Sequence, residues 1–132
     1  MTDSRKKISA FEERLVACAD ERSFKVSKNP TLYYIELEHT SRSRVVYLDR
    51  RKALLNAIAV SVSPESDLGC LASIPGLVIP VEFRHGSGMT RFPKRANKGE
   101  RPIHYGYLII CADIGAYGRL LKWVADEGAD TD

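Results

Sequence analysis

This chain of 132 residues has few of the patterns that identify enzymes and metal-binding proteins. Its three cysteines, Cys18, Cys70 and Cys111, are far apart and form no CxxC pair, so neither a disulfide framework nor a zinc site is predicted. We expect each to be a small buried residue with an inert thiol. No GxxxxGK[ST] loop, no GxGxxG at the start of a helix and no HExxH motif occurs. We therefore predict no cofactor and no metal.

Long apolar runs are also lacking. No run reaches the length that spans a membrane, and the first fifteen residues, MTDSRKKISAFEERL, carry charges without the apolar stretch of a secretory signal. The content of 44% hydrophobic and 28% charged residues is ordinary for a globular protein. These features predict one cytoplasmic domain over residues 1–132 that has no membrane partner.

Apolar residues recur at helical spacing near both ends of the chain. The first predicted helix covers residues 5–22, where Thr2 or Ser4 would cap its start. The second covers residues 114–126, where Asp113 would be the cap. The acidic residues that follow this second helix are expected to fray.

Between the helices the pattern changes to that of strands, most of them joined by short links. Two helices on one face of such a sheet make an α+β domain of two layers with a mainly antiparallel sheet. Strands are expected at 31–39, 45–49, 57–63, 77–83 and 105–113, with an edge position for 77–83 because Pro80 cannot donate to a ladder. The predicted core residues are Phe11, Leu15, Ile35, Leu37, Val60, Val62, Ile109 and Leu121.

The positive charge of the chain is concentrated in residues 84–104, which we call the basic arm. The arm holds six of the twenty Lys and Arg residues and one of the seventeen Asp and Glu residues, giving it a net charge of +5 against −2 for the rest of the chain. Its three Gly and two Pro residues prevent a long regular element. Such a concentration is the electrostatic signature of an anionic partner.

The arm predicts a non-enzymatic protein that binds an anionic partner, nucleic acid first. Lys and Arg would contact phosphates, and Phe92 would stack on bases unless it anchors the arm to the core. No helix-turn-helix, zinc-finger or RNP1 pattern predicts sequence-specific reading. The candidate binding residues are Arg84, His85, Arg91, Phe92, Lys94, Arg95, Lys98, Arg101 and His104.

Two alternatives remain open. The arm, or the edge strand at 77–83, would equally serve a small regulator or inhibitor that binds an acidic protein surface, for example a mobile-element-encoded modulator of a host nucleic-acid-processing complex. A third possibility is a metal-independent nuclease in which His85 and His104 perform acid–base chemistry. In the structural alternative to the nuclease, His104 donates to a backbone carbonyl and His85 is merely exposed.

Several short motifs are similar to those of one family. They are Phe92-Pro93, Gly99-Glu100-Arg101, His104-Tyr105-Gly106, the strand pair of 45–63, and a closing helix with Tyr117, Leu120, Leu121 and Trp123. With them the C-terminal two-thirds of the chain resembles the YgaC-like family of small cytoplasmic bacterial proteins of unknown function. The resemblance implies an α+β fold and a cytoplasmic location. It implies no activity and no catalytic residue.

Overall fold

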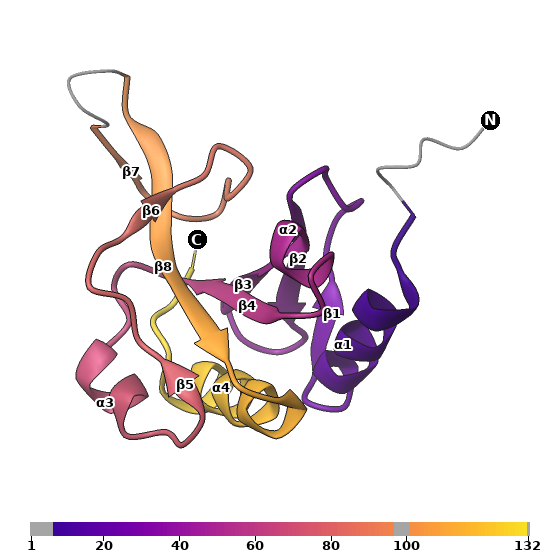
Figure 1. Cartoon of the computed structure of the whole chain (residues 1–132). Coiled ribbons are helices and arrows are strands. Elements are labelled where there is room, and N and C mark those ends of the chain that lie inside the picture. Colours follow the sequence, from indigo (N-terminus) through magenta and orange to yellow (C-terminus); the bar gives the residue numbers. More distant parts are fainter. Residues whose placement is uncertain (1–6, 97–100, 132) are drawn as a thin grey trace.

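The computed structural model of the chain describes residues 7–96 and 101–131 (Figure 1). Within these residues four helices and an antiparallel sheet of eight strands form the α+β fold that the sequence predicts. The helices are α1 (Ala10–Asp20), α2 (Arg50–Ala53), α3 (Leu68–Ala72) and α4 (Ile114–Glu127). The strands are β1 (Phe24–Val26), β2 (Tyr34–His39), β3 (Val45–Asp49), β4 (Ile58–Val62), β5 (Leu77–Val78), β6 (Arg84–His85), β7 (Lys94–Arg95) and β8 (Ile103–Cys111).

The main path of the sheet runs β1-β2-β3-β4-β8-β5, so β8 is central although it follows the other strands in the sequence. The short strands β6 and β7 also pair with β8, nearer its start. Figure 1 shows this part of β8 extending away from α1 and α4. Among residues 7–96 and 101–131, no helix is long and apolar enough to cross a membrane.

Helix α1 begins later than predicted. Ser9 Oγ accepts a hydrogen bond from the Glu12 backbone N at 3.1 Å, and Glu12 Oε1 accepts one from the Ser9 N at 2.9 Å. This capping box satisfies two of the free donors of the first turn and fixes the start at Ala10. The predicted caps Thr2 and Ser4 lie outside the described residues. Asp113, by contrast, is confirmed as the cap of α4, accepting from the Ala116 N at 2.8 Å.

Helices α1 and α4 pack on the same face of the sheet, as Figure 1 shows. The Tyr117 hydroxyl of α4 donates to the Leu15 carbonyl of α1 at 2.9 Å and joins the two helices. The predicted core is confirmed except at Phe11, which is half-buried. The fully buried members are Leu15, Ile35, Leu37, Val60, Val62, Ile109 and Leu121.

The opposite face of the sheet is also covered in its centre, which the sequence did not lead us to expect. Glu36 of β2, which alternates with the buried Ile35 and Leu37, is only 4% exposed. Val45 and Tyr47 of β3 form a second apolar cluster there with Met89 and Phe92 of the basic arm. Strand β2 is therefore covered on both faces at this point, because the arm lies over the second face.

Two further predictions about the chain's course are wrong. The strand expected at 77–83 stops after Val78 and does not reach Pro80, although it does lie at the edge of the sheet. The acidic tail was predicted to fray, but contacts hold it as far as residue 131. The Thr131 N donates to the Ser43 carbonyl, and Asp130 forms an ion pair with Arg44 at 2.9 Å. These contacts hold the tail against the 40–44 turn.

Candidate anion-binding site

The basic arm is built around the first half of β8. Arg84 of β6 pairs with Gly106, and Lys94 of β7 pairs with His104. The Gly86 N donates to the His104 carbonyl at 2.9 Å, and the Tyr105 N donates to the Pro93 carbonyl at 3.1 Å. Consecutive residues of a strand point their backbone groups to opposite edges, so β6 and β7 flank β8 on its two edges. Residues 86–93 must therefore cross over a face of β8.

Gly106 and Phe92 make this crossing possible. A Cβ atom at Gly106 would lie 2.6 Å from the Val62 carbonyl oxygen and 3.0 Å from two ring carbons of Phe92. Phe92 is 3% exposed and meets the Tyr47 ring edge to face, with centroids 5.0 Å apart. The ring therefore anchors the arm, and the prediction that Phe92 stacks on bases is wrong, because a buried ring offers no free face.

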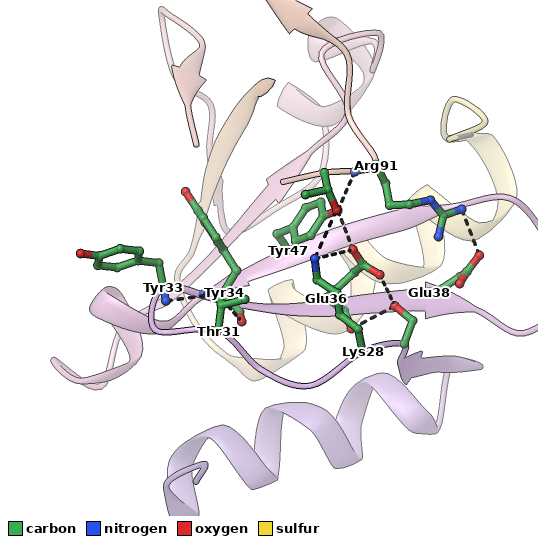
Figure 2. A network of polar contacts seen from close by, with 10 residues as sticks. Lys28, Thr31, Tyr33, Tyr34, Glu36, Glu38, Tyr47 and Arg91 are labelled. Atoms are coloured by element: carbon green, nitrogen blue, oxygen red, sulfur yellow. Dashed lines mark hydrogen bonds and ion pairs between the residues drawn. The ribbon is translucent and has the colours of Figure 1, made fainter. Parts of the chain in front are cut away.

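A buried carboxylate fixes the arm beside this anchor (Figure 2). Glu36 accepts hydrogen bonds from Ser27 Oγ at 2.6 Å and from the Tyr47 hydroxyl at 2.7 Å, and the same hydroxyl accepts one from the Arg91 backbone N at 3.0 Å. Burial, and next the hydrogen bond to Glu36, raise the pKa of Tyr47, so its hydroxyl stays protonated and keeps donating. Lys28 completes the network, with its Nζ 3.2 Å from Thr90 Oγ1.

Both histidines are engaged inside the arm. His104 Nδ1 lies 2.7 Å from the Phe92 carbonyl oxygen, and His85 Nε2 lies 3.1 Å from the Arg95 carbonyl oxygen. A carbonyl oxygen only accepts, so each of these nitrogens carries the hydrogen. The structural alternative for His104 is confirmed. His85 is not merely exposed, because its half-buried ring also contacts Phe83 and Tyr105. The arm therefore uses both rings as cross-links.

The cations of the arm fall into two groups. Arg91 is half-buried, forms an ion pair with Glu38 at 3.2 Å and donates to the Thr131 carbonyl at 3.4 Å, so it links the arm to β2 and to the tail. Lys98 lies outside the described residues. The remaining four are exposed: Arg84, Lys94, Arg95 and Arg101.

A cavity of about 260 Å³ separates the arm from α2 and brings in residues that the sequence analysis missed. Arg84 and His85 of the arm line it together with Tyr33, Tyr34, Arg51 and Lys52. The Arg51 guanidinium lies 4.4 Å from the centroid of the Tyr33 ring. The basic run Arg50-Arg51-Lys52 directly after a predicted strand is visible in the sequence. Only the pairing of the strands in the structure places this run opposite the arm.

The cysteines differ in their surroundings. Cys111 is 4% exposed, and burial raises the pKa of its thiol to about 12. Cys18 is half-buried, whereas Cys70 is exposed, so the prediction of burial is wrong for Cys70. Within the described part of the chain, no three His, Cys, Asp or Glu side chains gather as they would around a metal ion.

Comparisons with models of protein families, with curated protein sequences and with solved structures found no match to this chain. The resemblance to the YgaC-like family therefore stays a prediction.

Proposed function

We propose that this protein is a non-enzymatic, cytoplasmic binding protein that holds nucleic acid against its basic arm. One observation carries the proposal: among the described residues, none of the exposed cations of the arm forms an ion pair with an acid. These are Arg84, Lys94, Arg95 and Arg101. Cations that are left unpaired on one segment attract a polyanion and release its counterions when it binds.

The docking of the arm supports the same function. Short strands, the Phe92 anchor and the Glu36 network fix residues 84–95 of the arm to the sheet, so a ligand need not order this part. Lower ordering costs raise affinity without new contacts. Contacts between cationic side chains and the phosphate backbone position a nucleic-acid strand without reading its sequence.

A triple variant, Lys94→Ala, Arg95→Ala and Arg101→Ala, tests the proposal. Because these side chains are exposed, the thermal midpoint should stay nearly unchanged. Fluorescence anisotropy with single- and double-stranded oligonucleotides, repeated over a salt series, should show weaker binding. The slope of log K against log salt should fall by about 0.7–0.9 for each phosphate that the variant no longer neutralises.

The matched control removes three exposed cations from helices α1 and α4, namely Arg14, Arg119 and Lys122. This control variant should bind the oligonucleotides like the wild type if affinity depends on where the cations lie as well as on how many there are. Wild-type protein that shows no salt-sensitive binding to DNA or RNA at micromolar concentration would contradict the proposal.

A second candidate function, regulation of another protein, is favoured by a different surface. Val78 of the edge strand β5 is 60% exposed, and Val81 just beyond it is 98% exposed. An edge strand with apolar neighbours can pair with a strand of a partner. A pull-down from lysate with and without nuclease separates the two functions. A partner that survives nuclease treatment and is lost with Val78→Lys would identify a protein regulator.

A further inference from the structure

The cavity between α2 and the basic arm combines cations with aromatic rings. Arg51 and Lys52 line it from one side and Arg84 from the other. None of these three forms an ion pair with a described residue. The acid at the cavity is Asp49, whose Oδ1 accepts from the Lys52 backbone N at 2.9 Å as the cap of α2. Among the described residues, only this one carboxylate is present at the cavity to neutralise its three cations.

The charge balance of the cavity selects the charge of its ligand. Three cations against one carboxylate leave a net charge of +2 when His85 is neutral. A phosphate monoester carries a charge of about −1.5 to −2 at pH 7, whereas each phosphodiester inside a strand carries one negative charge. A dianion therefore neutralises the net charge of the cavity, whereas a monoanion neutralises only half of that charge.

One of the cations, and the backbone that carries a second, are held in position before any ligand arrives. The Tyr33 ring lies 4.4 Å from the Arg51 guanidinium, which restricts where this long side chain points. Arg84 lies on β6, whose pairing with Gly106 of β8 fixes its backbone. A planar guanidinium that is already oriented can bind two phosphate oxygens at once.

Tyr34 adds a neutral donor to the cavity. Its hydroxyl oxygen would lie 2.3 Å from a Cβ atom at residue 86, so the glycine there allows the arm to pass close over the ring. Burial and the nearby Asp49 carboxylate raise the pKa of Tyr34, which keeps the hydroxyl protonated. The hydroxyl makes no hydrogen bond to another described residue and is available to a phosphate oxygen.

We infer that this cavity binds the terminal phosphate monoester of a nucleic-acid strand. The inference rests on the proposed function and adds that the protein prefers strand ends that carry a phosphate. Arg51, Lys52 and Arg84 bind the phosphate oxygens. Tyr33 and Leu55 line the same cavity, where the terminal nucleoside lies.

The test compares three versions of one short single-stranded oligonucleotide: with a 5′ phosphate, with a 3′ phosphate, and with neither. Anisotropy should show about tenfold tighter binding of one phosphorylated probe, since a single charge-assisted hydrogen bond is worth about that factor. The preferred probe identifies which end the cavity takes.

Two double variants locate the preference. Arg51→Gln with Lys52→Gln should abolish it while leaving salt-sensitive binding of all three probes. Lys94→Gln with Arg95→Gln should weaken all three probes alike and keep the preference. A thermal melt of each variant should confirm that the fold is intact. We expect this result because Lys94, Arg95 and Arg51 are exposed and Lys52 is half-buried.

Three other outcomes would contradict the inference, its assignment to this cavity, or the proposed function. Equal, salt-sensitive binding of the three probes by the wild type overturns the inference and leaves the proposed function standing. A preference that survives in the Arg51→Gln, Lys52→Gln variant overturns the assignment to this cavity. If the wild type binds none of the probes, the proposed function falls, and the inference falls with it.

Discussion

Replacing Phe92 with Ala tests whether the basic arm is a packed part of the fold. Phe92 is 3% exposed, it contacts the Tyr47 ring edge to face, and its ring occupies the space that a Cβ atom at Gly106 would need. Burying a Phe side chain contributes about 2–3 kcal/mol, and an edge-to-face pair adds about 0.5–1.5 kcal/mol. We expect the free energy of unfolding to fall by about 3–4 kcal/mol, within the range measured for Phe→Ala in cores.

Urea denaturation followed by the fluorescence of Trp123 measures this change. In a protein of this size a decrease of that order lowers the thermal midpoint by about 11–14 °C. Phe83→Ala is the matched control, because the Phe83 ring is half-exposed against His85 and Tyr105, and its removal should cost only about 1 kcal/mol.

The opposite pattern would refute the reasoning. If Phe92 were a base-stacking residue on a solvated loop, Phe92→Ala would leave the unfolding midpoint unchanged. It would then weaken oligonucleotide binding by about 1–3 kcal/mol, the usual value of one stacked base. Unfolding and binding measured on the same sample therefore separate an anchor from a ligand contact.

Three further changes probe buried polar groups and thiols. Tyr47→Phe removes a donor from the buried Glu36 and an acceptor from the arm backbone, and it should cost about 1–3 kcal/mol in urea denaturation; an unchanged midpoint would contradict the network. Burial raises the pKa of Glu12, but hydrogen bonds from Arg50 and Ser9 and the Arg50 charge outweigh it, and the net shift is downward. Its stabilisation is therefore present at pH 7 and is lost as the pH falls through the lowered pKa. Glu12→Gln should cost about 2–4 kcal/mol at pH 7 and clearly less below about pH 4, whereas the exposed neighbour Glu13→Gln should change little at either pH. Iodoacetamide should modify the exposed Cys70 well before the buried Cys111, whose pKa is raised to about 12, as mass spectrometry of the native protein would show; rapid labelling of Cys111 would mean that β8 opens.

The parts of the fold that the sequence predicted depend on local patterns. Helix α4 and its Asp113 cap need only helical periodicity and an acidic side chain directly before the first helical residue. Strands β2, β3 and β4 were visible because apolar residues alternate or run together over the length of a strand. The capping box of Ser9 and Glu12 is equally visible in the pattern Ser-x-x-Glu, which competes with Thr2 and Ser4 for the start of the first helix.

The parts that were not predicted depend on contacts between distant segments. Val45, Val46, Tyr47 and Leu48 form a continuous apolar run, which is typical of a strand covered on both faces, but no pattern says what covers the second face. Met89 and Phe92 do so from inside a segment dominated by its charge. Arg51 and Lys52 likewise join Arg84 only through the antiparallel register, which composition does not specify.

The position of β8 has a consequence for the order in which the protein is made. This strand pairs with β4, β5, β6 and β7, yet it follows all of them in the chain. During synthesis β1 to β4 emerge as a meander whose inner edge, at β4, has no partner until residue 111 has left the ribosome. An unpaired apolar edge at that stage invites pairing with other chains and makes the nascent protein a client for chaperones. A premature stop before Ile103 should therefore yield aggregated product and no smaller folded domain.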